Sequence, residues 1–235
     1  DSRLEPFLDN YLIGSQANTA LRLQTPRPAE TVIQFNDKWE GRYCGYVTVF
    51  KDGDRYRMYY RGNPLAGKDG SDWEVTCYAE SPDGIHFTKP ELGLHEYEGS
   101  KANNIFLANQ APFSHNFAPF KDPRPGVPAE EQYKAIAGTS ETGLHAFYSA
   151  DGIHWTKQDK ALITDGAFDS QNLAFWDAKA GLYRAYWRYF TGGTTDEKNW
   201  KPSGDRAIRT ATSKDFIHWE NQHDLSYTDS PSEAL

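Results

Sequence analysis

The stretch Ser149–Trp155 (SADGIHW) decides the fold of this chain, because the chain repeats it. The same phrase stands earlier at Ser81–Phe87 (SPDGIHF) and later, with Phe in place of Gly, at Ser213–Trp219 (SKDFIHW). Its aspartate recurs at intervals of 68 and 64 residues. Recurrence at a nearly constant period indicates a repeated structural unit.

Each copy of the phrase has the chemistry of a β-hairpin. An apolar or aromatic run such as Leu144–Tyr148 precedes it, Ser-x-Asp-Gly supplies turn residues, and Ile-His-Trp resumes a strand. The Asp carboxylate and the Ser hydroxyl can bond turn amides. We therefore interpret Asp151 and His154, with their counterparts, as structural residues of the repeat rather than catalytic ones.

The composition is typical of an all-β protein. The chain has 235 residues, of which 14% are aromatic, with 13 prolines and 19 glycines, and no helical stretch stands out. Its net charge of −8 argues against nucleic acid and against an anionic membrane surface as partners. No apolar run approaches the length that spans a bilayer.

Strand patterns divide the chain into similar units. The first unit is expected to hold strands at 43–50, 55–61, 73–79 and 86–89, which is the pattern of a four-stranded propeller blade. The predicted ranges are 31–98 for blade 1, 99–165 for blade 2, 166–228 for blade 3 and 229–235 for the start of blade 4. Residues 1–30 are expected to form N-terminal strands at Leu4–Ile13 and Ala20–Gln24, of which the second closes the ring.

About three blades are too few for a closed ring, because three would leave unpaired backbone groups at an open edge. We therefore expect the missing blades to come from the remainder of a longer chain or from another chain. We expect the exposed edge to favour oligomers or aggregation.

Polar residues gather where the expected first strands begin and the second strands end, at one face of the propeller. Such a polar, aromatic-lined funnel is suited to bind a sugar. The alternative is a purely structural role, in which single residues such as Asp169 and Asn172 only cap loop amides. The candidates are Trp39, Glu40, Arg61, His115, Asn116, Asp169, Gln171, Asn172 and Arg188.

The blade ending at Ser149–Trp155 and the run Arg206–Trp219 resemble the five-bladed β-propeller glycoside hydrolases: invertases, arabinofuranosidases, xylosidases and neoagarobiose hydrolases. Phe168–Asn172 and the opening Phe7–Ile13 are similar to uncharacterised secreted members of that group. The resemblance implies an all-β, five-bladed propeller and a secreted or periplasmic location. It implies no cofactor, although a structural Ca2+ on the propeller axis is an option.

In the five-bladed β-propeller glycoside hydrolases that the chain resembles, three carboxylates from the first strands of blades one, two and three carry out glycoside hydrolysis. Carried over by position, Glu40 and Asp169 are the expected acid/base pair, with their roles undecided. Blade two has His115 instead of a carboxylate, and we expect it to act as a proton donor. Trp39, Arg61, Asn116, Gln171, Asn172 and Arg188 are the expected substrate-binding residues, and Asp229 and Glu233 are further candidates at the same rim.

Two other functions stay open at this point. A non-catalytic carbohydrate-binding propeller would account for the missing carboxylate of blade two. A structural or protein-binding propeller would instead present an apolar face where the sequence places polar side chains.

Overall fold

A computed structural model describes residues 10, 12–65, 69–195 and 199–226 of the chain. The chain divides into two units, Asp1–Thr31 and Val32–Leu235, and each is described by itself. The predicted start of blade 4 and the candidates Asp229 and Glu233 lie outside the described residues. In the described part of the chain, no helix is long and apolar enough to cross a membrane.

The first unit contains no strand in its described residues. Residues 20–24 form no strand here and Leu23 is 96% exposed, and the ring-closing role expected of Ala20–Gln24 stays a prediction. A strand needs a neighbour to satisfy its backbone N–H and C=O groups, and the described residues of this unit offer none. The other strand expected here, at 4–13, lies mostly outside the described residues.

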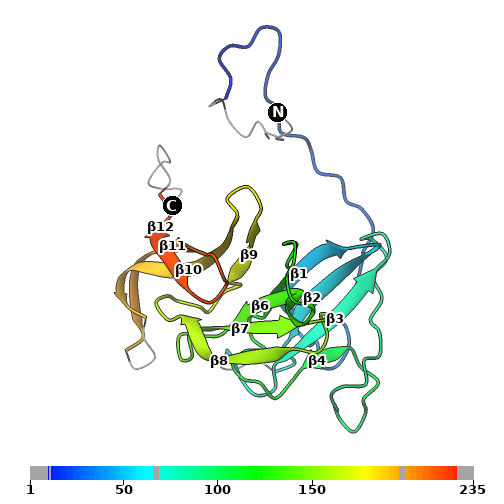
Figure 1. Cartoon of the computed structure of the whole chain (residues 1–235). Helices are drawn as coiled ribbons and strands as arrows, with labels where there is room; N and C mark the ends of the chain where they lie inside the picture. The colour runs from blue at the N-terminus through cyan, green and yellow to red at the C-terminus, as the bar shows by residue number, and fades with distance from the viewer. Residues whose placement is uncertain (1–9, 11, 66–68, 196–198, 227–235) are drawn as a thin grey trace. The chain divides into compact units, whose positions relative to one another are not determined.

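The second unit is all-β apart from one short 3₁₀ helix, η1 at Ala129–Glu131. It consists of three four-stranded antiparallel sheets (Figure 1). The strands are β1 Gly45–Asp52, β2 Arg55–Gly62, β3 Val75–Ser81 and β4 Ile105–Leu107 in the first sheet; β5 Ala118–Lys121, β6 Tyr133–Ala137, β7 Leu144–Ser149 and β8 Thr156–Ile163 in the second; and β9 Leu173–Asp177, β10 Leu182–Thr194, β11 Lys201–Ser213 and β12 Trp219–Asp224 in the third.

Neighbouring strands in each sheet follow the chain order, so every sheet is a meander. The first strands of the three sheets adjoin, since β5 contacts both β1 and β9. This arrangement is propeller-like, and the number of blades and the closure of a ring remain predictions.

The fourth strand of the first sheet differs from the expectation. Residues 86–89 contribute only an isolated bridge, between Thr88 and Glu80. The strand that pairs with β3 is β4, which begins at Ile105, beyond the predicted end of blade 1 at residue 98. The segment between residue 89 and β4 does not pair with β3. Its residues Leu92 and Leu94 pack instead against the core between the first two sheets.

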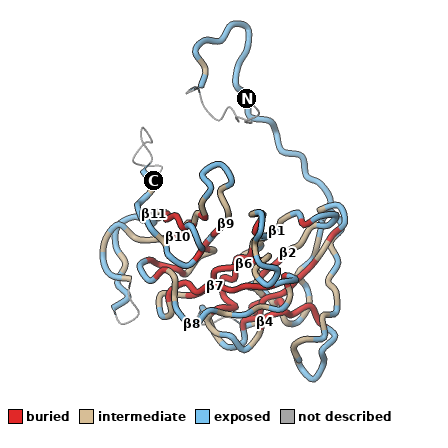
Figure 2. The backbone as a smooth tube through the Cα atoms, in the orientation of Figure 1, coloured by how far each residue is buried: buried red, intermediate tan, exposed pale blue. Residues whose placement is uncertain are grey.

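The second sheet lies between the other two, so both of its faces are covered and its central strands consist of buried residues. Every residue of β6 and β7 is buried, which Figure 2 shows as red backbone through both strands. Tyr59 and Phe147 meet in the core between the first and second sheets. Ile136 and Trp187 meet in the core between the second and third. A buried side chain of this size contributes roughly 1.5–3 kcal/mol.

A polar clamp joins each pair of adjacent sheets. The carboxylate of Asp52, at the end of β1, accepts hydrogen bonds from Lys121 and from the Tyr133 hydroxyl of the second sheet, both at 2.5 Å. Asp122 directly follows β5 and accepts a hydrogen bond from Tyr183 of the third sheet. Both carboxylates are buried and paired with cations, so they hold sheets together.

The repeated phrase forms the same turn in all three sheets. In the second sheet, Asp151 Oδ1 accepts the backbone N–H groups of Ile153 and His154, both at 2.8 Å. Its Oδ2 lies 2.7 Å from His154 Nδ1. The same bonds recur around Asp83 and Asp215. The phrase is structural, as the sequence predicts.

Candidate functional site

His115 is the centre of a cluster of ionisable side chains. It lies in the loop that leads into β5 and is 0% exposed. Its Nδ1 atom is 3.0 Å from Glu74 Oε2, and its Nε2 atom is 3.2 Å from Asp169 Oδ1. Arg61 Nη1 approaches the same ring at 3.1 Å. One imidazole thus bridges two carboxylates that come from different sheets.

The two carboxylates hold His115 in its charged form. Burial lowers the pKa of this imidazole, but hydrogen bonds to Asp169 and Glu74 outweigh that effect and raise the pKa from 6.5 to about 8. An imidazolium has an N–H on both nitrogens, so it donates to both carboxylates at once. The cluster is therefore more stable with His115 protonated.

Asp169 is a member of the cluster that a ligand can reach. It lies in the loop before β9, and its side chain is 42% exposed. The hydrogen bond from His115, with a further contribution from Arg188 at 3.4 Å, lowers the pKa of Asp169 to about 2. Asp169 is therefore ionised at neutral pH and suits a nucleophile or a base.

Asp69 and Glu74 complete the cluster, and the sequence analysis missed both. Glu74 precedes β3 and is buried, where its carboxylate accepts hydrogen bonds from the Asn63 side chain and the Gly70 N–H, both at 3.1 Å. Asp69 is exposed at the rim of the same cluster. Partial loss of water around its carboxyl, followed by the nearby negative charges of Asp169 and Glu74, raises the pKa of Asp69, although the charge of His115 opposes this shift. Asp69 and Asp169 thus shift in opposite directions.

Among the described residues, one group has the geometry to hold a metal ion. The ligand atoms of Asp69, Glu74 and His115 all lie within 4.8 Å of one another. With His115 neutral, one imidazole nitrogen and two carboxylates would suit Zn2+, Mn2+ or Fe2+. They do not fit Ca2+, which takes six to eight oxygen ligands. The described residues therefore give no support to the optional structural Ca2+.

Glu40 does not belong to this cluster, contrary to the prediction. Its side chain is 0% exposed and accepts three hydrogen bonds: from Lys89 Nζ at 2.7 Å, from the Asp37 N–H at 2.8 Å and from the Tyr60 hydroxyl at 2.5 Å. These bonds use both carboxylate oxygens, and no hydrogen bond joins Glu40 to His115 or Asp169. The reason is local, because the turn at residues 37–41 directs this side chain into the core of the first sheet.

Three of the expected substrate-binding residues serve the structure instead. Asn116 and Asn172 are both 0% exposed, and their amides donate to the carbonyl of Phe168, at 2.7 and 3.0 Å. They fix the loop that carries Asp169. Trp39 donates from Nε1 to the Asn104 side chain at 2.8 Å and packs against Tyr97. For these residues the simpler interpretation, in which they bond loops and core, holds.

The remaining expected residues do lie at the cluster or beside it. Arg61 contacts His115 and lies over the ring of Tyr46, 4.5 Å from its centroid. Arg188 contacts Asp169. Gln171 donates to Thr48 Oγ1 at 2.8 Å and lines a nearby cavity.

A cavity of about 360 Å³ adjoins Asp169 on the third sheet. Its lining residues are Ser170, Gln171, Leu173, Tyr186, Trp187, Arg188, Arg206, Ala207 and Ile208. A second cavity, of about 210 Å³, lies by Arg55 and Glu80 of the first sheet, where the two side chains pair at 3.1 Å. Only the larger cavity includes a residue that contacts the cluster, namely Arg188.

Comparison with known proteins places the fold. No family model matches the chain, and no curated protein matches it in sequence. A glycosyl hydrolase from Bacteroides ovatus is similar in structure, with a TM-score of 0.52, 18% identity, 82% of this chain and 55% of that chain covered. A structure from the GH130 family of mannoside phosphorylases, a family containing glycoside hydrolases that target β-1,2 mannosidic linkages in Candida mannan, has a TM-score of 0.51 at the same identity and coverage.

These similarities show that the chain has the fold of such glycoside-processing proteins. The chain spans about 55% of the length of each of the two. At 18% identity the likeness concerns the fold, so the activity has to be argued from the residues of this chain.

Proposed function

We propose that the protein is a glycoside hydrolase that acts on an oligo- or polysaccharide, with Asp169 and Asp69 as its carboxylate pair. The observation that carries this proposal is the placement of two solvent-accessible carboxyl groups, Asp69 and Asp169, beside the buried His115, with pKa values shifted in opposite directions. Glycoside hydrolysis needs one protonated and one ionised carboxyl group. The fold shared with glycoside-processing proteins supports the same class.

The roles follow from the directions of the two pKa shifts. Asp69, whose raised pKa favours the protonated form, would donate a proton to the leaving glycosidic oxygen. Asp169, ionised, would attack the anomeric carbon or activate a water molecule. Asp69 takes the place that the sequence analysis gave to Glu40.

His115 has a positioning role in this proposal. It is fully buried, so it acts through Asp169 rather than on the substrate. Its Nε2–H holds one oxygen of Asp169, while Arg188 holds the other. These two donors keep the carboxylate ionised and oriented. The proposal includes the secreted or periplasmic location that a polysaccharide substrate favours, which cell fractionation would test.

The test uses aryl and alkyl glycosides, whose leaving groups differ in quality. A 2,4-dinitrophenolate leaves without a proton, whereas a poor leaving group such as methanol needs general acid catalysis. We expect Asp69→Asn to lower kcat about 10²-fold or more on methyl glycosides and little on dinitrophenyl glycosides. Asp169→Asn should lower kcat by ~10² or more on both.

Turnover by Asp169→Asn at the wild-type rate would contradict the proposal. Saccharide binding by the wild-type protein without turnover of any glycoside would also contradict it, and would indicate a carbohydrate-binding protein.

A further inference from the structure

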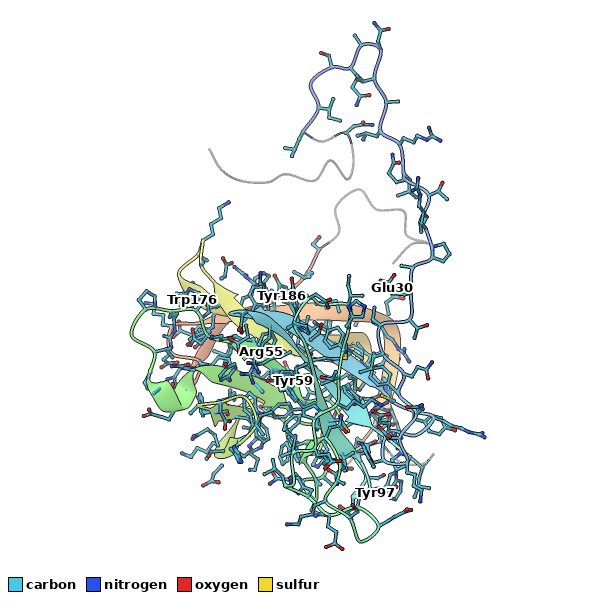
Figure 3. The ribbon with its side chains drawn as sticks, turned by 90° about the vertical axis from the view of Figure 1, so that its right-hand side faces the viewer. Glu30, Arg55, Tyr59, Tyr97, Trp176 and Tyr186 are labelled. Carbon is cyan, nitrogen blue, oxygen red and sulfur yellow. The ribbon has the colours of Figure 1, made fainter. Side chains whose placement is uncertain are left out.

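The cavity beside Asp169 has two different walls. Leu173, Tyr186 and Ile208 supply apolar and aromatic surface from β9, β10 and β11. Arg188 and Arg206 supply two guanidinium groups. Tyr186, labelled in Figure 3, belongs to this lining and stacks on Phe175 with ring centroids 6.1 Å apart. An aromatic wall with a few convergent polar groups is typical of small-ligand sites.

The two arginines are held near one another by a shared aromatic ring. Phe190 pairs with Arg206 across β10 and β11. The Arg206 guanidinium lies 5.9 Å from the centroid of the Phe190 ring, and the Arg188 guanidinium lies 5.3 Å from the same centroid. Two like charges that share one ring repel each other, and a bound anion would relieve that repulsion.

The positive charge of this pair is only half compensated. Arg188 is paired with Asp169 at 3.4 Å. Within the part of the chain that the structure describes, no carboxylate lies at ion-pair distance from Arg206, whose residue is exposed. The cavity therefore carries an excess positive charge in a chain whose net charge is −8. A chain with a net negative charge does not attract anions as a whole, so the two arginines indicate a ligand that binds locally in this cavity.

We propose that this cavity is a subsite for an anionic saccharide unit, whose carboxylate or sulfate group binds Arg206 and Arg188. The inference rests on the proposed glycoside hydrolase function and specifies its substrate class. A guanidinium offers a planar pair of N–H donors that matches either anion, and the apolar wall can pack against the sugar ring. Because Ser170 and Arg188 line the cavity, the charged unit would sit next to the bond that Asp169 acts on.

Binding of three simple probes tests the subsite: D-glucuronate, D-glucose 6-sulfate and D-glucose. Each is titrated into the protein, with tryptophan fluorescence as the readout because Trp187 lines the cavity. We expect at least one charged probe to bind about tenfold or more tightly than glucose. The preference for glucuronate or for the sulfate identifies the anion.

Two variants with the same change of charge provide the control. Arg206→Gln should lower the affinity for the charged probe about tenfold and leave that for glucose unchanged. Lys201→Gln removes a positive charge from the same strand, β11, but lies outside the cavity, so it should leave both affinities unchanged. Raising the salt concentration should weaken binding of the charged probe only.

Equal affinity for charged and neutral probes would overturn the inference, and so would equal losses in the two variants. Because the probes bind without turnover, this result is separate from the hydrolase test. An active hydrolase that treats neutral and charged sugars alike would refute the subsite and keep the function. Arg206-dependent binding of anions without hydrolysis would support the subsite and refute the hydrolase function.

Discussion

Glu40 and Asp169 are acids of similar chemistry in two very different environments. Glu40 is sealed in the first sheet at 0% exposure, and a lysine, a tyrosine and a backbone amide use both of its oxygens. Asp169 is held by His115 and Arg188 on one side, but its side chain is 42% exposed beside a cavity. The first environment stabilises the fold, and the second leaves a carboxylate available to a ligand.

This difference shows that charge and position along the chain do not by themselves identify a functional acid. Both residues stand shortly before the first strand of a sheet, and the sequence analysis grouped them for that reason. Only their partners separate them. An acid whose hydrogen-bonding capacity is consumed by the protein has none left for a substrate.

The largest expected effect comes from breaking the buried pair. Lys89→Met should destabilise the protein by about 3–5 kcal/mol, because the fully buried Glu40 carboxylate loses its cation. Chemical denaturation measures this change. Lys38→Met is the control, since Lys38 pairs with Glu98 at the exposed surface and should change stability by less than about 1 kcal/mol. Equal effects would show that the Glu40 pair is not a structural element.

The cluster at His115 should make stability depend on pH. The folded pKa of about 8 exceeds the ordinary value of 6.5, so the protonated histidine stabilises the fold fully below pH 6.5. That contribution is lost as pH rises through 8, and it amounts to about 2 kcal/mol. Denaturation at pH 6 and pH 9 should show this difference in the wild type and lose it in His115→Gln. The same pH dependence in both proteins would contradict the assignment.

Asp151 extends the comparison of Glu40 with Asp169, because its carboxylate is exposed to solvent but is not free to bind a ligand. Its side chain is 52% exposed, yet the turn amides and His154 occupy its oxygens. Asp151→Ala should lower stability by about 1 kcal/mol through lost turn bonds and leave substrate affinity unchanged. Thermal unfolding together with a binding titration checks this. A loss of affinity at unchanged stability would make the turn part of the site.

Much of the fold could be predicted because the signals are local. The SxDG turn and the alternating aromatic strands fix most of the strands of the three sheets, since each depends on residues near in sequence. The fourth strand of the first sheet could not be placed, because β4 follows a segment whose path depends on packing of Leu92 and Leu94 against a distant core. The strand expected at Ala20–Gln24 has no partner among the described residues, so its role in closing a ring stays a prediction.

The candidate site was predictable in part for the same physical reason. His115 and Asp169 shortly precede the first strands β5 and β9, and Arg61 and Arg188 lie on the second strands β2 and β10, so the strand order brings them to one face. Asp69 and Glu74 lie in a loop between β2 and β3 that has no repeated pattern, so periodicity does not reveal them. One signal for Glu74 was present in the sequence. Glu74 directly precedes β3, whose first residues pair with the end of β2 that carries Arg61.

The most direct test of the central claim compares Asp169→Asn and Glu40→Gln in one assay, with kcat and the melting temperature measured on the same samples. The account predicts that Asp169→Asn loses ~10²-fold or more in kcat and melts near the wild-type temperature. Glu40→Gln should melt at a lower temperature and keep the kcat of its folded fraction within about twofold. A Glu40→Gln variant that keeps its melting temperature but loses turnover, beside an active Asp169→Asn, would contradict the account.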